Sequence, residues 1–278
     1  MQNYTYHCHT TFSDGKSSVK EMIDKAVSLG FKEIGISDHL AIHKNFLESP
    51  SWPRFSEYYA PHIYRTDFAS SLSEFQRHAD NIRLIADNYP IKVYVGAEVD
   101  YMPYKGWLEE FIEFKEKAGL DYYLTGNHYV FSDTGETLFH PRDIPLLFSH
   151  KEQVNIIHNH FNTLIIAIKS KLFDFLGHLD FMRKAEVYKQ EDFSDDINEL
   201  LKTLSENHMP AEINTKGYKK YNDAYPTQPI IQMMKKYNIP ILISDDAHHA
   251  DDVGKEFIRV EEKLKNIKYT NRWKLNRE

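Results

Sequence analysis

The sequence predicts an α/β fold in which parallel strands form a closed or nearly closed barrel. Short apolar segments alternate with longer amphipathic segments about seven times along the 278 residues, a pattern typical of parallel strands joined by crossover helices. Histidine and acidic residues directly follow many of the apolar segments, as expected where strand ends form the functional face of a barrel. No linker or change of composition divides the chain, so we expect one domain over residues 1–278.

The first half of the chain contains clear helical periodicity. Val19, Met22 and Ala26 recur at helical spacing, and this segment stops at Gly30, a residue type that often ends helices. A second helical segment begins after the break at Pro103. In order, this half is predicted to contain a strand at 4–7, a helix at 19–29, a strand at 33–37, a helix at 68–88, a strand at 92–97, a helix at 107–118 and a strand at 121–126.

The second half repeats the alternation and ends in a helical, basic tail. It is predicted to contain a helix at 150–170, a strand at 173–177, a helix at 195–207, a strand at 211–214, a helix at 228–236 and a strand at 240–244. Two insertion loops interrupt the repeat, near 40–66 and 132–145. The first is rich in Pro, Trp and Tyr and is predicted to be irregular, and long irregular segments are often functional.

The composition excludes several classes of protein. A net charge of −7 and a pI near 6.1 argue against a nucleic-acid binder or a protein of anionic membrane surfaces, because both need a positive surface. The single cysteine, Cys8, allows no internal disulfide and fits a reducing compartment. No secretory signal pattern and no run long enough for a membrane span is found, so we expect a cytoplasmic protein. The oligomeric state cannot be predicted from these features.

The first polar cluster, His7-Cys8-His9, suggests the start of a metal site. On a strand, two residues at this spacing point the same way while the residue between them points the opposite way. Two imidazoles aimed at one point are typical of metal coordination, although the pattern alone is weak. The same alternation predicts that Cys8 is buried packing and not a ligand.

Further candidate ligands recur at predicted strand ends along the chain. Nine candidates are too many for one ion and imply two or three metals, with Glu98 or a water bridging a pair. Imidazole and carboxylate ligands suit Zn, Mn, Fe or Co. The candidate metal ligands are His7, His9, Asp14, His39, Glu98, His128, His178, Asp246 and His248.

Each candidate also has an ordinary structural interpretation. Asp38 before His39, or Asp245, could cap a helix, and Glu98 could pair with a nearby Lys or Arg. His128 could lie in a solvated turn, and His178 could be a buried histidine bonded to a carbonyl. Their joint placement at separate strand ends favours the metal interpretation.

The motifs resemble those of the PHP (polymerase and histidinol phosphatase) family. They occur in the family's order over residues 7–248 as HCHTTFSDG, ISDH, GAE, NH, GHLD and DAH. The segment 211–220, AEINTKGYKK, looks like a stretch of the histidinol-phosphatase branch. The sequence departs from that branch at TGNH, where SVH is more usual, and at Lys216, where a small or hydrophobic residue is expected.

The resemblance implies a distorted (β/α)7 barrel with a di- or trinuclear metal site at the C-terminal ends of its strands. Carried over by motif, one metal would be held by His7, His9, Glu98 and Asp246. A second would be held by Glu98, His128 and His178, and a third by Asp14, His39 and His248.

The activity that the resemblance implies is metal-dependent hydrolysis of a small phosphate monoester, most specifically L-histidinol phosphate in histidine biosynthesis. An activated water would attack phosphorus in line. Asp246 or His248 could protonate or steer the leaving alkoxide or act on that water.

Cationic partners for the phosphate are predicted after two strand ends. Arg183 could reach the mouth of the barrel and bind phosphate, or pair with Asp180 or Glu186. Lys216 is a second candidate, while Arg54 and Arg142 in the insertion loops are weaker ones. Acidic and aromatic residues of the 40–66 segment could contact the amine and imidazole of histidinol, or simply pack locally. These are Glu48, Trp52, Glu57, Tyr58 and Tyr59.

Two alternative functions remain open. The chain could be a PHP phosphoesterase for another substrate, such as a nucleotide, a phosphotyrosine peptide or a nucleic-acid end. It could also be a PHP-like module that binds metal without catalysis, although the complete ligand set argues against this.

Overall fold

The computed structural model, which describes residues 1–58 and 63–276, contains the expected nearly closed barrel of parallel strands. Seven strands follow one another in the sheet order β1-β2-β5-β6-β9-β10-β11, and the pairs between them are parallel. Their bounds are β1 Tyr4–Thr5, β2 Glu33–Ile36, β5 Lys92–Val99, β6 Tyr122–Thr125, β9 Phe175–Leu176, β10 Ala211–Asn214 and β11 Ile241–Ser244.

The seam between the first and last strands closes through a few specific contacts. Cys8 and Ala247 form an isolated parallel bridge, in which the backbone N–H of His9 donates to the carbonyl of Ala247 over 2.8 Å. Nearer the N-terminal ends of the strands, the side-chain amide of Gln2 donates to the carbonyl of Ile243 and accepts from the N–H of Ile243. These bonds bring the two ends of the chain's sheet together where the strands themselves are too short to pair.

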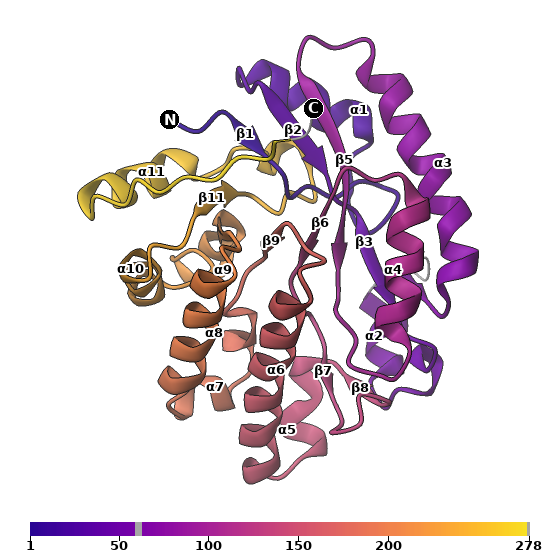
Figure 1. Cartoon of the computed structure of the whole chain (residues 1–278), viewed down its shortest axis with the longest axis vertical. Helices are drawn as coiled ribbons and strands as arrows, with labels where there is room; N and C mark the ends of the chain where they lie inside the picture. The colour runs from indigo at the N-terminus through magenta and orange to yellow at the C-terminus, as the bar shows by residue number, and fades with distance from the viewer. Residues whose placement is uncertain (59–62, 277–278) are drawn as a thin grey trace.

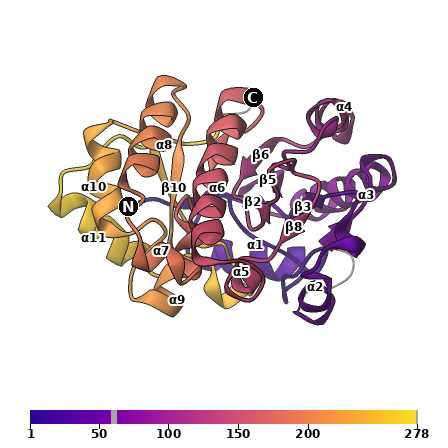
Figure 2. The same ribbon diagram turned by 90° about the horizontal axis from the view of Figure 1, so that it is seen from below.

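Helices cover the outside of this sheet (Figure 1). In Figure 2, α3 and α4 lie together on one side and α8, α10 and α11 on the other, with α6 between them. All of the long helices except the last were predicted from periodicity to within two residues at each end, and for the last only the helical character of the tail was expected. Their bounds are α1 Val19–Ser28, α3 Phe68–Ala86, α4 Trp107–Ala118, α6 His150–Ser170, α8 Ser194–Glu206, α10 Gln228–Lys236 and α11 Phe257–Asn266.

The segment near 40–66 is not irregular as predicted. It contains β3 (His39–Ile42), α2 (Trp52–Tyr58) and β4 (Tyr64–Arg65), and β3 pairs with both β4 and β5. The periodicity is hard to see because the helix is short and contains Pro53. Buried Phe55 packs on Phe46 and Tyr64, so aromatic packing stabilises the segment.

The segment near 132–145 lies against the first insertion. It contributes β8 (Leu138–Phe139), which pairs with β7 (Val130–Phe131), and leads into α5 (Ile144–Leu147). Arg54 donates to Asp143 over 2.6 Å, and the hydroxyl of Ser49 donates to the carbonyl of Leu138 over 2.6 Å. The two insertions are therefore tied to each other by polar contacts.

Aromatic rings fill the N-terminal end of the barrel. Tyr122 is fully buried, and the absence of side chains at Gly35 and Gly96 makes room for its ring: a Cβ at Gly96 would lie 2.4 Å from it. The Tyr122 hydroxyl donates to the carbonyl of Tyr6 over 2.7 Å. With it packs a separate apolar cluster whose other members are Tyr4, Tyr6, Tyr94, Leu124, Phe175, Leu242 and Leu275.

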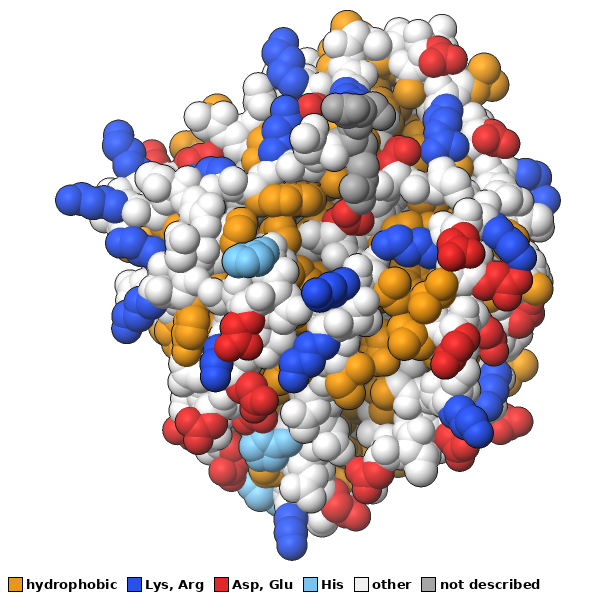
Figure 3. Space-filling view, viewed as in Figure 1, with side chains coloured by type: hydrophobic (Ala, Val, Ile, Leu, Met, Phe, Trp, Pro, Cys, Tyr) orange, Lys and Arg blue, Asp and Glu red, His pale blue; other side chains and the backbone are white. Residues whose placement is uncertain are grey.

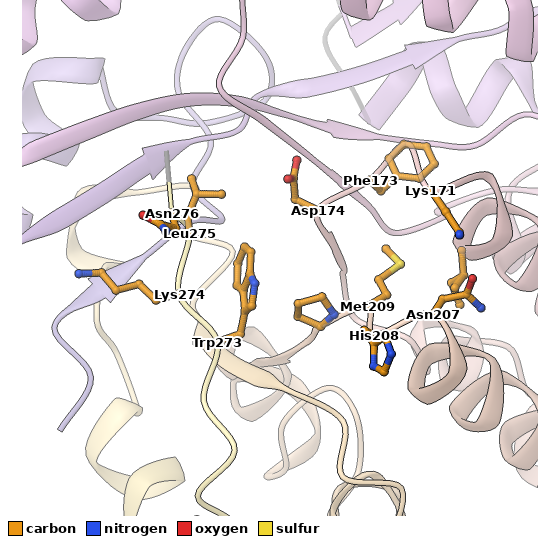
Figure 4. A pocket seen from close by; sticks show the side chains of 12 residues that line it. Lys171, Phe173, Asp174, Asn207, His208, Met209, Trp273, Lys274, Leu275 and Asn276 are labelled. Atoms are coloured by element: carbon orange, nitrogen blue, oxygen red, sulfur yellow. The ribbon is translucent and has the colours of Figure 1, made fainter. Parts of the chain in front are cut away.

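A cavity of about 410 Å³ lies outside this aromatic end, beside the residues that precede β9 and β10 (Figure 4). Trp273, Met209 and His208 are among the residues that line it. On the face that Figure 3 shows, acidic and basic side chains are interspersed. Within the described ranges, no helix is long and apolar enough to span a membrane.

Candidate metal centre

The structure brings all nine candidate ligands to the C-terminal end of the barrel. His7 and His9 flank the seam bridge after β1, and Asp246 and His248 flank its other side after β11. The remaining ligands follow or belong to other strands. Asp14 lies in the loop after β1, His39 begins β3, Glu98 lies in β5, His128 follows β6 and His178 follows β9.

Glu98 lies at the centre of the cluster and is fully buried. Its Oε2 is 3.2 Å from His7 Nε2, 3.3 Å from His9 Nε2 and 3.1 Å from His39 Nδ1. Its Oε1 is 2.8 Å from His178 Nε2 and 3.6 Å from His128 Nε2. The two oxygens of one carboxylate thus face two different groups of imidazoles, an arrangement suited to bridging two metals.

A further group lies beside His9. His39 Nε2 is 3.4 Å from one oxygen of Asp14, and His248 Nε2 is 3.0 Å from the other. The ring of His9 is 4.3 Å from the rings of both histidines, measured between centroids. His9, Asp14, His39 and His248 therefore form a compact set of nitrogen and oxygen donors.

The donor atoms fit a divalent transition metal because several have no hydrogen-bond partner while being buried. These atoms include His7 Nε2, both ring nitrogens of His9, Asp14 Oδ1 and Glu98 Oε2. Leaving such groups without a partner costs free energy, which a bound cation would offset. Imidazole and carboxylate donors are those that Zn, Mn, Fe and Co accept in proteins.

The electrostatics of the cluster favour the metal-binding form of Glu98 and His9 but not of every ligand. Burial opposes ionisation of Glu98, but His7, His128 and His39 outweigh it and hold the pKa of the carboxyl well below its usual range. Burial, together with the neighbouring His39 and His248, lowers the pKa of His9 to about 3, so its ring is neutral at physiological pH. A neutral imidazole and an ionised carboxylate are the required ligand forms. Burial opposes the charge on His7 and His39, but neighbouring carboxylates outweigh it and raise the pKa of both rings well above the usual range, so a metal that binds these rings must displace a proton.

Two buried carboxylates behind the ligands were missed by sequence reasoning. Glu212 Oε2 lies 2.9 Å from His7 Nδ1, and Asp100 Oδ2 lies 3.1 Å from His128 Nδ1. Each carboxylate places the ring proton on Nδ1 and leaves Nε2 to face the centre. Glu212 belongs to the recognised AEINTKG stretch, so this motif carried a signal, whereas Asp100 is identified only by its position two residues after Glu98.

Backbone geometry also shapes the centre. Asp246 has a left-handed φ of 47°, a conformation that Asp tolerates better than most residues and that often marks functional sites. Gly126 lies against the ring of His178: a Cβ there would be 2.6 Å from Cε1 of that ring. The glycine before Asn127 is thus needed for close packing of a candidate ligand.

Asp38 fixes the loop that carries Asp14. The Asp38 carboxylate accepts from the backbone N–H and hydroxyl of Thr10 and from the hydroxyl of Ser13, over 2.6–2.8 Å. His78 Nε2 lies 2.9 Å from its second oxygen. Asp38 therefore anchors this loop. None of the described helices begins at Asp38, so the alternative interpretation of this residue as a helix cap is wrong.

Lys216 lies at the edge of the cluster. Its Nζ is 3.0 Å from Asp246 Oδ1 and 3.0 Å from His248 Nδ1. Lys216, the residue at which the sequence departs from the histidinol-phosphatase branch, thus places an ammonium group against two candidate ligands. The side chain remains 38% exposed, so the ammonium can also meet a ligand that enters from solvent.

Arg183 is buried between aromatic rings. Its guanidinium carbon lies 3.9 Å from the ring centroid of Tyr225 and 4.3 Å from that of Tyr221. Asp180 is its carboxylate neighbour at 3.8 Å. The ion pair of Arg183 with Asp180, which was the alternative to phosphate binding, is therefore present. Contact of Arg183 with the phosphate stays a prediction.

The other candidates of the insertions pack locally, line another cavity or are exposed. Trp52 packs against Tyr64, and Glu57 lines a cavity of about 300 Å³ near Arg54. Glu48 and Arg142 are exposed, while Tyr59 and the side chain of Tyr58 lie outside the described residues. Cys8 is fully buried, with its Sγ 3.5 Å from Asp245, as strand alternation predicted.

A parallel α/β barrel with clustered imidazoles and carboxylates at its strand ends defines the class of metal-dependent hydrolases. The model of the PHP domain family matches residues 5–216. The chain belongs to this family.

Curated relatives with similar lengths carry one activity in their names. A Deinococcus radiodurans protein named "Probable histidinol-phosphatase" is 22% identical over 94% of this chain and 92% of its own. The histidinol-phosphatase of Bacillus subtilis is 22% identical over 91% of this chain and 96% of its own.

Solved structures show the same fold. A Listeria monocytogenes protein, provisionally named a histidinol phosphatase, superposes with a TM-score of 0.73 at 19% identity, covering 92% of this chain and 99% of that one. The histidinol phosphate phosphatase of Lactococcus lactis, solved with Zn, L-histidinol and phosphate, gives 0.63 at 15% identity, covering 96% and 94%.

Proposed function

We propose that the protein is a metal-dependent phosphomonoesterase that hydrolyses L-histidinol phosphate to L-histidinol and phosphate. The observation that carries this proposal is the cluster around Glu98, whose two oxygens face two groups of histidines. Bound divalent metals would lower the pKa of a water and neutralise charge on the phosphoryl oxygens. We propose two or three ions per chain, with ligand sets as the motifs assign them.

The chain's own residues supply the remaining parts of the reaction. Glu212 and Asp100 hold the rings of His7 and His128 in the orientation that faces the centre. Asp246 and His248 lie where they could handle the proton of the leaving alkoxide, and Lys216 lies beside both. Water adds to phosphorus, the ester P–O bond breaks, and the alkoxide receives a proton.

A cleft next to the centre offers a place for the organic part of the substrate. It has a volume of about 140 Å³, and its lining includes both acidic and basic side chains. These lining residues include Asp246, His248, Tyr218, Asp252, Glu256, Lys216, Lys219 and Lys255, of which Lys219 and Lys255 pair with Asp252. Histidinol carries an amine and an imidazole, which favour carboxylate and aromatic neighbours. We propose that this cleft receives the histidinol part of the substrate.

Steady-state kinetics of the metal-loaded protein on a panel of substrates tests the proposal. The panel contains histidinol phosphate, mononucleotides, phosphotyrosine and an oligonucleotide. We expect kcat/KM for histidinol phosphate to exceed the others by at least about tenfold, since a cleft that pairs with the substrate's polar groups discriminates against analogues that lack them. A smaller preference would contradict the substrate, and no hydrolysis of any ester would favour a non-catalytic module.

Elemental analysis of the reconstituted protein tests the metal content separately. We expect at least about two transition-metal ions per chain, because a bridged site needs a pair. A single ion per chain would contradict the bridged arrangement even if an ester were hydrolysed.

A further inference from the structure

Lys184 brings a second lysine close to the centre, from a different strand end than Lys216. It ends the short helical turn Phe181–Lys184 that follows β9 and His178. Its Nζ lies 3.3 Å from the ring centroid of Phe181. That ring is in turn 4.7 Å from His128 and 5.0 Å from His178, between centroids. The cation–π contact therefore holds the ammonium against a ring that also contacts two candidate ligands.

The ammonium of Lys184 has no carboxylate partner within 4 Å among residues 1–58 and 63–276, unlike its neighbours in sequence and space. Arg183 has Asp180, Lys189 has Glu186 at 2.8 Å, and Lys216 has Asp246 at 3.0 Å. Burial, followed by the repulsion of Lys216, lowers the pKa of Lys184 well below its usual range, and only Asp246 opposes them among the leading influences. Lys220 and Arg142 add further repulsion.

A cation desolvated among other cations is unfavourable unless an anion joins it. In the free protein the partly exposed Lys184 ammonium therefore lies on the ring of Phe181 among other cations, without a paired carboxylate in the described part of the chain. A phosphate ester brings terminal oxygens to a metal centre, and an ammonium can donate to one of them.

We propose that Lys184 binds a terminal oxygen of the substrate phosphate, opposite Lys216, so that two lysines from neighbouring strand ends hold the phosphoryl group. This inference rests on the proposed phosphomonoesterase function. It also predicts selectivity: a monoester has three terminal oxygens and a charge near −2, whereas a diester has two and a charge of −1. Two lysines beside the metals therefore favour a monoester over a diester.

Binding of inorganic phosphate to the metal-loaded protein, measured by calorimetry, tests the proposal without requiring turnover. Lys184→Met should weaken phosphate binding by about tenfold or more, the usual effect of losing a hydrogen bond to a charged group. Lys184→Arg, which keeps the charge, should recover part of the loss. Lys189→Met is the matched control, because Lys189 is exposed and already paired with Glu186, and it should bind phosphate as the wild type does.

Kinetics separate binding from a merely structural role. In Lys184→Met, KM for histidinol phosphate should rise by about tenfold or more, with kcat changing less and metal content unchanged. Lys184→Gln serves as a second variant if the methionine protein does not fold. Wild-type phosphate affinity in the folded Lys184→Met or Lys184→Gln protein would overturn the proposal. Loss of phosphate affinity in a protein that does not hydrolyse histidinol phosphate would support the Lys184 site and refute the substrate.

Discussion

The two ends of the barrel are built from the same short strands but hold opposite chemistry. The C-terminal end gathers buried imidazoles and carboxylates around Glu98, several of them without hydrogen-bond partners. The N-terminal end is filled by the rings of Tyr122 and its aromatic neighbours. The hydroxyls of Tyr4 and Tyr122 donate to backbone carbonyls, and that of Tyr6 donates to the carboxylate of Glu33. The buried polar groups of the C-terminal end lower the free energy of unfolding, while the apolar burial of the N-terminal end raises it. Substitutions at the two ends should therefore affect different measurements.

The largest expected effect is on activity, from Glu98→Gln at the C-terminal end. Removing the charge that faces both groups of histidines should reduce metal content and lower kcat/KM by at least about 1,000-fold, or about 4 kcal/mol of transition-state stabilisation. Elemental analysis and kinetics measure both changes. Glu113→Gln, at an exposed residue paired with Lys117, is the control. Full metal content and activity in Glu98→Gln would show that Glu98 is not a metal ligand.

Tyr122→Ala should have the largest effect at the other end, but on stability. Deleting a fully buried ring should lower the free energy of unfolding by about 3–5 kcal/mol. Tyr122→Phe keeps the ring and loses the hydroxyl with its bond to the Tyr6 carbonyl, so it should cost about 1 kcal/mol. Denaturant unfolding gives both values, and metal affinity of the folded protein should not change. A weaker metal site in folded Tyr122→Ala would show that the two ends are coupled.

Glu212→Gln tests whether residues behind the ligands belong functionally to the C-terminal end. It removes the charged partner of His7 Nδ1, and metal affinity should fall by about 10–100-fold, the usual effect of losing such a partner. Competition with a chromophoric chelator measures this affinity. Glu206→Gln, at an exposed position of α8, should bind metal as the wild type does. Equal affinities for the two variants would assign Glu212 a purely structural role.

A pH dependence is expected at the aromatic end, smaller than the effects of Glu98→Gln and Tyr122→Ala. Burial raises the pKa of Tyr4 to about 12, so the folded protein keeps a proton that the unfolded chain loses above pH 10. Stability from this group should therefore fall as pH rises from 10 to 12, by about 1.4 kcal/mol at pH 11. Tyr4→Phe should lack this part of the alkaline loss. Parallel unfolding curves of the two proteins from pH 9 to 11 would show that Tyr4 does not contribute.

Much of the fold could be predicted because its signals are local. The bounds of α4, α6, β10 and α10 follow from apolar periodicity and from nearby breaks, which act within a few residues. The helix α2 was missed because it is short and its stability comes from contacts of Phe55 with distant rings. The position of the site could also be predicted, because parallel strands bring their C-terminal ends together and the motifs with histidines and carboxylates lie at those ends.

The contacts behind and beside the ligands could not be predicted. Tertiary packing decides whether a buried carboxylate such as Asp100 faces a histidine. It also decides whether the ammonium of Lys184 lies in solvent or against an aromatic ring. Neither choice leaves a periodic pattern in the sequence. These are also the positions where the structure adds most to the chemistry.

The seam of the barrel has a consequence for biosynthesis. The donors of Asp14 and His248 meet although they are 234 positions apart in the sequence, and the bridge beside them joins Cys8 to Ala247. A nascent chain emerging from the ribosome would carry His7, His9 and Asp14 long before their partners are translated. The complete centre can assemble only after β11 has been made, so metal loading would be one of the last events in the maturation of each molecule.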